Sequence, residues 1–570
     1  MRRIVVVIAS VVASLIGWAA FQASAPSPER ELASLMPQGA QLFLEAKDLS
    51  GLLQEWNESP EKAAWLKSDN YEVLSRSRLL LRLSQAQQQF ASAAGVPPDY
   101  KFLREVAGQR SALGIYDIGK LELLYITRLP SSSAMRSGLW QQRSKFEPRQ
   151  SAGKQFFVRA EAESGRVVAF ALDGDYLVLG TREDLVAGAL SLLAGQKVTS
   201  LQQESWYVNA VKAGKDAGDL RLVVHLAEVT RTPQFRTYWI QQNITELRQY
   251  ESSISDLYRT PGEYREERAL LLRSADSATA DAGDSERVGE LVRMVPDDAG
   301  VYRCKATPSV EEVLTALETT VLTPKLGPAP PAKIAPVVSM GEGTVGSASS
   351  LETRIDVAPP GGEVNAGRGD EALKALLAEA KVQAMLQTHR SEIMADGVFV
   401  RLHSAVVLSA QTEWNEQNVL KAIQQTIAPG LTASGLGAGW RIVGSAPQSY
   451  FEMDGLNPVA VALQGKTVIV ATDGPTLKAI LARSGGKGSA ESATYVARFR
   501  HGAERENFYK LTALLDKSSP SSYGISDREP EFFSQNIGSL SQTLGGIKSE
   551  SITMRRAGGM DLQTVRYEWR

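Results

Sequence analysis

The hydrophobic positions along the chain form two segments that resemble each other closely. Residues 168–181 contain two apolar runs on either side of an Asp-Gly-Asp turn, and residues 459–472 contain two apolar runs around a Gln-Gly-Lys turn. Short apolar runs separated by such a turn predict β-hairpins with buried strands. After each hairpin the apolar spacing predicts a helix, over 184–193 in the first segment and over 476–482 in the second.

Two further pairs of segments indicate an internal repeat. Residues 31–40 and 290–299 share a short helix-like stretch, a Pro turn and a following apolar strand, and the tripeptide Gln-Asn-Ile occurs at 242–244 and again at 535–537. The number of residues that separates the two members of a pair is larger for the later pairs than for the first. The second copy therefore contains extra residues, and a stretch rich in Pro, Gly, Ser and Ala occupies 323–370. The pattern predicts a duplicated domain with an insertion in its second copy.

These matches set the domain boundaries that we expect. The chain divides into a signal anchor at 1–27, a first α+β repeat at 28–273, a polar linker at 274–284 and a second α+β repeat at 285–570, with a flexible Pro/Gly-rich insertion at about 323–370.

The remaining strand signals are antiparallel hairpins. One is expected at 112–127, and a looser counterpart has 398–402 and 405–408 as its two strands. A third hairpin, around a Gly-Gly turn, closes the chain at 552–567. Hairpins interrupted by helices indicate the α+β class. We expect two similar halves, each an antiparallel sheet with packed helices, after one N-terminal membrane helix.

A long helix is expected over 71–94. Leu and Phe positions within it lie beside Arg76, Arg78 and Arg82, so the helix has an apolar side and a basic side. We interpret the basic side as a solvated face.

The N-terminus carries two arginines and then an apolar run. Arg2 and Arg3 precede residues 4–21, which at about 1.5 Å per helical residue nearly cover a hydrocarbon core of about 30 Å. A signal peptide and a signal anchor both fit this pattern, but the cleavage-like Ala-Ser-Ala at 23–25 is followed by Pro26, which favours an uncleaved anchor. The body is then expected beyond the inner (cytoplasmic) membrane, in the periplasm or outside, and cleavage would give a secreted form.

Composition narrows the classes of function. The 570 residues include 62 Lys and Arg against 64 Asp and Glu, a net charge of −2. Balanced charge argues against nucleic acid, or an anionic membrane surface, as a partner held by charge alone. A hydrophobic content of 43% is ordinary for a folded protein, and one cysteine and four histidines leave little material for a disulfide framework or a zinc site.

Motifs that carry known chemistry are mostly absent from the sequence. Ser59–Lys62 and Ser484–Lys487 match the Ser-x-x-Lys spacing of penicillin-recognising enzymes, but the companion signatures are missing. Cys304 lies in a predicted strand and is expected to be a buried, inert thiol. The histidines are scattered, and none is followed by Glu as a metalloprotease motif requires: His225, His389, His403 and His501. We therefore assign no catalytic residue, cofactor-binding residue or metal ligand, and we expect no cofactor.

Three stretches give the chain a family likeness: the strand entry at 35–40, residues 112–117 running into 123–127, and the repeated hairpin. With the N-terminal anchor they resemble an uncharacterised family of bacterial cell-envelope proteins, classed as a domain of unknown function. The resemblance covers most of the chain and implies its membrane address and its fold. That family carries no assigned reaction or binding residues, so the resemblance implies no site.

Three functions remain open. The anchor, the duplicated domain and the missing catalytic set favour a membrane-tethered, non-catalytic interaction or assembly module with an envelope protein as partner. The alternative is a carrier or binding protein that holds an apolar or lipid-like ligand between its two halves. The second alternative is a hydrolase with a site assembled from scattered Asp, Glu, Ser or Tyr residues, which a shared cleft with strongly perturbed carboxylates would reveal.

Overall fold

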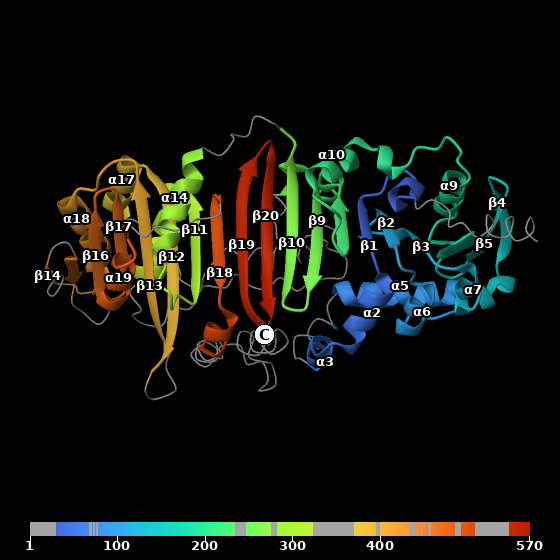
Figure 1. Ribbon diagram of the computed structural model, residues 1–570, viewed down its shortest axis with the longest axis horizontal. Coiled ribbons are helices and arrows are strands. Elements are labelled where there is room, and N and C mark those ends of the chain that lie inside the picture. The colour runs from blue at the N-terminus through green and yellow to red at the C-terminus, as the bar shows by residue number, and fades with distance from the viewer. Residues whose placement is uncertain are drawn as a thin grey trace, which may run out of the picture.

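The structure is a computed structural model (Figure 1). It describes residues 30–67, 71, 75, 78–233, 247–274, 282–322, 370–394, 400–431, 439–445, 448–453, 458–484, 492–507 and 546–569. The predicted anchor at 1–27, both Gln-Asn-Ile tripeptides and residues 323–369 of the predicted insertion lie outside the described residues. Within the described ranges, no helix has both the length and the apolar content needed to cross a membrane.

In the described part of the chain, twenty strands form one sheet, and all neighbouring strands are antiparallel. Their order across the sheet is β4-β5-β6-β7-β3-β2-β1-β8-β9-β10-β20-β19-β18-β11-β12-β13-β17-β16-β15-β14. Helices accompany the sheet, so the α+β class predicted from the sequence is confirmed.

The strands β1–β10 belong to the part of the chain before residue 275, which we call the N-terminal half, and β11–β20 belong to the C-terminal half. The strands of the N-terminal half are β1 Leu42–Ala46, β2 Ser111–Asp117, β3 Glu122–Arg128, β4 Glu147–Ser151, β5 Lys154–Ala160, β6 Val167–Asp173, β7 Tyr176–Gly180, β8 Leu220–Val224, β9 Tyr250–Thr260 and β10 Glu263–Leu272. Those of the C-terminal half are β11 Val301–Ala306, β12 Val382–Ile393, β13 Val400–Ala410, β14 Trp440–Val443, β15 Tyr450–Met453, β16 Val459–Gln464, β17 Thr467–Ala471, β18 Tyr495–Phe499, β19 Ile547–Ala557 and β20 Met560–Trp569.

Helices connect the strands in both halves. In the N-terminal half they are η1 Leu32–Leu35, α2 Leu49–Glu58, α3 Pro60–Leu66, α5 Arg78–Ala94, α6 Tyr100–Val106, α7 Ser131–Ala134, α8 Gly138–Gln141, η2 Arg143–Lys145, α9 Glu183–Leu193, η3 Leu201–Gln203, α10 Ser205–Ala213 and α11 Leu226–Val229. In the C-terminal half they are α14 Ala282–Arg293, α15 Val310–Leu317, the π-helical turn η4 Glu318–Leu322, α17 Asp370–Ala380, α18 Glu416–Leu431 and α19 Gly474–Leu481.

The buried core lies on both faces of the sheet, because successive side chains of a strand point to opposite faces. We call the face of Val178 and Ile469 face A; η1, α9 and α10 pack on it in the N-terminal half, and α14 and α19 pack on it in the C-terminal half. We call the opposite face, which carries Leu179 and Val470, face B. Helices α5 to α8 cover face B in the N-terminal half, and α15, η4, α17 and α18 cover it in the C-terminal half.

The two halves are joined by strand pairing. Strand β10 pairs with β20 from Glu263 opposite Glu568 to Leu271 opposite Met560. The hydroxyl of Tyr250 also donates to a carboxylate oxygen of Asp561 at 2.5 Å. The sequence predicts one sheet in each half, whereas the structure has one continuous sheet. The physical reason is that β10 and β20 each end a run of ten strands, and mutual pairing satisfies the backbone groups that an edge strand leaves open.

Two other expectations need correction. Residues 400–410 form the single strand β13, not two strands of a hairpin, and the partner of β13 is β12 at 382–393. The expected linker at 274–284 overlaps the start of α14 at Ala282, where Asp284 pairs with Arg287 at 2.6 Å within the first turn. The long helix expected over 71–94 is described as α5 from Arg78 to Ala94.

Candidate functional site

An apolar cavity lies on face B of the N-terminal half, with a volume of about 510 Å³. Strands β1, β2, β3, β7 and β8 form its floor, and helices α2, α5 and α6 form its roof. In Figure 1 these three helices lie below the strands of the N-terminal half, on the opposite side from α9 and α10. The floor includes Leu44, Leu113, Leu123, Leu179 and Leu220, and the roof includes Leu49, Leu53, Leu83, Phe90 and Phe102.

The roof helices direct apolar side chains to the cavity by helical spacing. In α5 the lining residues are Leu83, Ala86, Gln87 and Phe90. Ala86 and Gln87 each lie three or four residues from Leu83 and from Phe90, which places all four on one face of the helix. Aspartates cap the other two helices: Asp48 accepts a hydrogen bond from the Gly51 amide in α2, and Asp99 accepts one from the Phe102 amide in α6, both at 2.9 Å.

One end of the cavity is closed by tightly packed aromatic side chains. The rings of Phe90 and Phe102 meet edge to face with their centres 5.8 Å apart. Beyond them, Phe170 and Leu177 are buried beneath α5, α6 and α7. The cavity therefore begins where this core stops, above β1, β2 and β3.

The cavity is open to solvent through its roof. Leu83 and Leu103 both line it, yet they are 42% and 41% exposed. Large apolar side chains that line a cavity and also face water allow an apolar ligand to enter without crossing a polar barrier.

The polar groups that line the cavity are occupied by the protein itself. The Tyr125 hydroxyl donates to the backbone oxygen of Val106 at 3.0 Å and lies 3.1 Å from the hydroxyl of Ser111. Burial raises the pKa of Tyr125, so its hydroxyl stays neutral. The Thr181 hydroxyl donates to the backbone oxygen of Leu121 at 3.2 Å and accepts from the Leu123 amide at 2.9 Å. Because these hydroxyl groups are hydrogen-bonded within the protein, they leave the cavity interior apolar toward a ligand.

Leu121 lines the cavity with an unusual backbone conformation. Its φ angle is 53°, in the left-handed region, which costs a residue other than glycine about 1–2 kcal/mol. Strained residues of this kind are concentrated at functional sites. The turn between β2 and β3 thus combines backbone strain with a side chain at the cavity wall.

One charged side chain stands out in the cavity wall. Among the described residues that form its wall, Arg166 alone is charged. Its guanidinium donates to the backbone oxygen of Lys120 at 2.9 Å and to the side-chain oxygen of Gln89 at 3.2 Å. These two bonds hold the guanidinium between α5 and the turn that joins β2 to β3.

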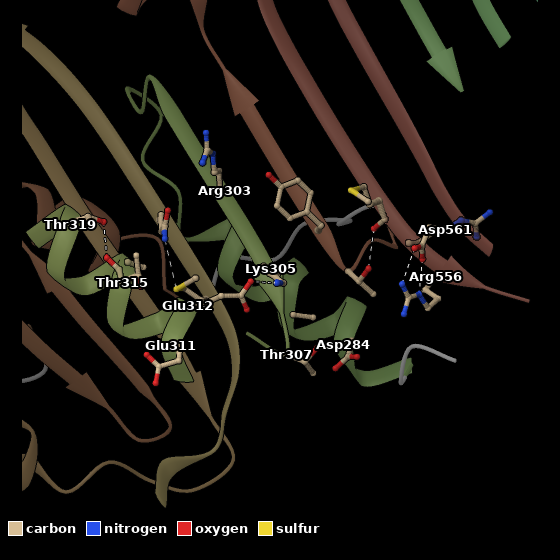
Figure 2. Close-up of a pocket in the computed structure, with 18 residues that line it drawn as sticks. Asp284, Arg303, Lys305, Thr307, Glu311, Glu312, Thr315, Thr319, Arg556 and Asp561 are labelled. Atoms are coloured by element: carbon tan, nitrogen blue, oxygen red, sulfur yellow. Dashed lines mark hydrogen bonds and ion pairs between the residues drawn. The ribbon is translucent and has the colours of Figure 1, made fainter. Parts of the chain in front are cut away.

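A second cavity, which we call the polar groove, lies on face B of the C-terminal half and has a volume of about 1020 Å³. Figure 2 shows its wall, which is formed by α15 and by strands including β11, β19 and β20. Lys305 pairs with Glu312 at 2.5 Å, and Arg556 pairs with Asp561 through two contacts of 2.6 and 2.8 Å. Much of its charge is therefore neutralised within the wall.

Two acids of the polar groove, Glu312 and Asp561, are held ionised. Burial alone would raise the pKa of Glu312 and of Asp561, but the hydrogen bonds from Lys305 and from Arg556 with Tyr250 lower both pKa values overall. A general acid for catalysis near neutral pH needs a raised pKa. These two carboxylates therefore serve structural ion pairs, and the groove has the character of a polar surface recess.

The two halves also border a recess of about 320 Å³ on face A at their junction. Lys215, Arg265, Glu267 and Arg555 are among the residues that line it. Charged walls do not suit an apolar ligand. The apolar cavity lies within the N-terminal half and not at the boundary where the sequence places a ligand site.

The histidines singled out from the sequence are held apart in separate local contacts. His225 stacks on Trp206 with ring centres 4.7 Å apart, and His389 lies 3.0 Å from the Ser404 hydroxyl. His403 contacts Asp473 at 2.8 Å and Glu392 at 3.1 Å. His501 lies 3.7 Å from Glu550. Within the described ranges, no group of His, Cys, Asp and Glu side chains is placed to hold a metal ion.

The other residues singled out have structural contacts. Cys304 is buried in β11, and burial raises the pKa of its thiol to about 12, so it remains protonated at physiological pH. The Ser59 hydroxyl accepts from the Lys62 amide at 3.2 Å, which is a capping contact at the start of α3. Residues 485–487 of the second Ser-x-x-Lys match lie outside the described residues.

Leu83 and Phe90 belong to the apolar side of the helix expected over 71–94, but the sequence does not indicate that they line a cavity. The prediction for the helix over 71–94 concerns its basic side, whereas the side that faces the cavity forms the candidate site. The available signal is the run Leu83, Ala86, Gln87 and Phe90, in which an alanine and a glutamine stand where a core-packing helix would have large apolar side chains.

No family model and no curated protein matches the chain. Two solved structures are similar to it at low level. The structure of crystal form I of TP0453 has 11% sequence identity and a TM-score of 0.24, and the match covers 46% of this chain and 85% of that chain. The structure of crystal form III of TP0453 has 10% identity and a TM-score of 0.24, with 49% and 90% covered. Likeness at this level carries no argument about fold or function.

Proposed function

We propose that the protein is a carrier or binding protein for an apolar, chain-like ligand, which it holds in the apolar cavity of its N-terminal half. The observation that carries the proposal is a cavity of about 510 Å³ whose polar wall groups are hydrogen-bonded within the protein. Ligand sites are typically concave, mostly apolar and about 300–1,000 Å³ in volume. The cavity favours the carrier over an assembly module, because a concave apolar space between helices and sheet suits a small ligand better than a partner chain.

The energetics set a minimum size for the ligand. Burying one methylene contributes about 0.8 kcal/mol, so a chain of about ten methylenes contributes roughly 8 kcal/mol. Association costs about 4–15 kcal/mol. A short apolar molecule would therefore bind weakly, and the ligand we propose has an alkyl chain of about ten carbons or more.

We also propose the membrane address that the sequence predicts. A single-pass anchor at 1–27 in the inner membrane would hold the cavity close to a bilayer, which is a source and a destination for apolar chains. Membership of the uncharacterised envelope family stays part of this proposal.

We further infer that the chain arose by duplication. Adding ten to each strand number turns the order β4-β5-β6-β7-β3-β2-β1-β8-β9-β10 into the order of the C-terminal half read from its outer edge. The matching segments 168–181 and 459–472 correspond to β6–β7 and β16–β17 in that relation. Both observations support a common ancestor for the two halves.

Binding of a neutral fluorescent probe tests the proposed function. The full chain in lipid nanodiscs is titrated with N-phenyl-1-naphthylamine, and empty nanodiscs give the background. In the variant Ala86→Trp the indole occupies the cavity, so the affinity should fall by about tenfold or more. Ala375→Trp is the matched control, because Ala375 is an exposed residue of α17. Equal binding by both variants and the unmodified chain would refute the proposed site.

A further inference from the structure

Among the described residues that line the apolar cavity, the one charged side chain suggests the chemistry of one end of the ligand. Arg166 follows the turn between β5 and β6, and it is half-buried. A guanidinium carries five N–H donors in a fixed, planar arrangement and is always protonated. Two donor groups are engaged, one by the backbone oxygen of Lys120 and one by the side-chain oxygen of Gln89. Both acceptors are neutral, so neither balances the positive charge.

Carboxylates in the neighbourhood of Arg166 are engaged elsewhere. Glu122 pairs with Arg182 at 2.8 Å. Glu161 accepts two hydrogen bonds from Ser164, one from the amide at 2.7 Å and one from the hydroxyl at 2.8 Å. Within the part of the chain that the structure describes, Arg166 has no ion pair with a carboxylate. The cavity therefore presents a fixed, uncompensated cation beside a long apolar wall.

The geometry points to an amphiphile with an anionic head: its alkyl chain fills the apolar cavity, and its carboxylate or phosphate head binds the guanidinium of Arg166. This inference rests on the proposed function and specifies its ligand class. Arginine suits planar carboxylate and tetrahedral phosphate groups through paired hydrogen bonds. Because the guanidinium is already held by Gln89 on the roof and Lys120 on the floor, it would bind the head without losing much side-chain entropy. The same contacts place the head at the edge of the roof and direct the chain beneath α5.

Competition between ligands that differ only in their head groups tests the inference. The full chain in nanodiscs is loaded with the neutral naphthylamine probe at about pH 8, where a carboxylate is ionised. Dodecanol, dodecanoate and dodecyl phosphate then displace the probe, with empty nanodiscs as the background. We expect the two acids to bind about tenfold more tightly than the alcohol, which is the contribution of one charge-assisted hydrogen-bonding pair. Tighter binding of dodecanoate would indicate a fatty acid, and tighter binding of dodecyl phosphate would indicate a phospholipid-type head.

Substitutions separate the head contact from the chain contact. Arg166→Gln should remove the preference for the acids, so that dodecanoate and dodecyl phosphate bind about as tightly as dodecanol, whereas Arg166→Lys should retain part of the preference because it keeps the charge. Arg159→Gln is the matched control: Arg159 is half-buried on the same hairpin but does not line the cavity. Circular dichroism of each variant confirms that it is folded.

The outcomes distinguish this inference from the proposed function. If dodecanol binds and the acids show no preference, or if Arg166→Gln keeps the preference, the anionic head is refuted and the apolar site stands. If neither the probe nor any of the three amphiphiles binds the unmodified chain, the proposed function fails and this inference fails with it.

Discussion

The same face of the sheet is covered in two different ways. On face B of the C-terminal half, α15, η4, α17 and α18 pack on β12, β13, β16 and β17, where Leu317 and Leu377 are each 1% exposed, and the recess beside this core is the polar groove with its charged walls. On face B of the N-terminal half, α2, α5 and α6 leave a cavity of about 510 Å³ above β1, β2 and β3. The strands follow the same order in both halves, so the side chains of the helices and strands, and not the strand order, make one region a core and the other a candidate binding site.

The difference can be traced to the side chains that the helices present. In the C-terminal half Val313, Leu317 and Leu377 fill the space between helices and strands. In the N-terminal half the centre of the roof is formed by Ala86 and Gln87, which are too small or too polar to fill it. A cavity persists where large apolar residues are missing, because the surrounding elements relax only partly. The comparison teaches that two runs of strands with the same order can carry different sites, because the side chains that cover them differ.

The largest difference in stability between the two halves is expected when a large side chain is removed. Leu377→Ala removes a fully buried side chain from α17 and should lower the free energy of unfolding by about 2–5 kcal/mol. Leu83→Ala in α5, already 42% exposed, should cost less than about 1 kcal/mol. Native-state hydrogen exchange, read separately on peptides of each half, measures both effects. Equal losses would mean that the two helix layers are packed alike.

A gain in side-chain size should also destabilise the C-terminal half more than the N-terminal half. Ala422 in α18 is 4% exposed within the packed core, and Ala422→Trp should destabilise the C-terminal half by about 1–3 kcal/mol or more through overpacking. Ala86→Trp enters the cavity and should leave stability unchanged or raise it by up to about 1 kcal/mol. Thermal unfolding of both variants gives the comparison. A strong destabilisation by Ala86→Trp would be incompatible with an open cavity.

The smallest expected effect concerns pH. Burial, aided by the positive charge of Arg303, lowers the pKa of His389 below its usual value of about 6.5. The unfolded chain therefore binds more protons than the folded one below about pH 6.5, and stability is lost as the pH falls through that value. The slope for this one group is at most about 1.4 kcal/mol per pH unit.

This pH dependence should be localised. Hydrogen exchange in the C-terminal half should accelerate between about pH 6.5 and pH 5, and His389→Gln should reduce the acceleration. The N-terminal half contains one histidine, His225, so it serves as the internal reference. An unchanged slope in His389→Gln would assign the effect to other groups.

Much of the strand framework could be predicted from the sequence. The hairpins at 168–181 and 459–472 correspond to β6–β7 and β16–β17, because each pairs two short apolar runs around a turn. The first hairpin at 112–127 and the terminal hairpin at 552–567 likewise correspond to β2–β3 and β19–β20. Strong local patterns of this kind need no long-range information.

Other features depend on contacts that sequence periodicity does not contain. Strand β12 contains the polar run Gln387-Thr388-His389-Arg390, so the sequence does not predict it as a strand. The sequence prediction therefore divides its partner, β13, into two strands of a hairpin. The pairing of β10 with β20 joins residues about 300 positions apart. Local patterns say nothing about such an edge-to-edge contact.

The candidate site was the least predictable feature. Leu44 on the floor and Phe90 on the roof belong to separate elements, and an apolar helix face has the same spacing whether it packs against a core or lines a cavity. Arg166 gives no signal in the sequence, because its role depends on the neutral acceptors at Lys120 and Gln89. Only the tertiary arrangement brings these groups together.

The most direct test of the central claim is native mass spectrometry of the full chain, gently extracted from its own membrane. The account predicts a bound species of several hundred daltons that is present on the unmodified chain and on Ala375→Trp but absent from Ala86→Trp. A bare chain in all three samples, or a bound species that persists in Ala86→Trp, would contradict a ligand site in the apolar cavity.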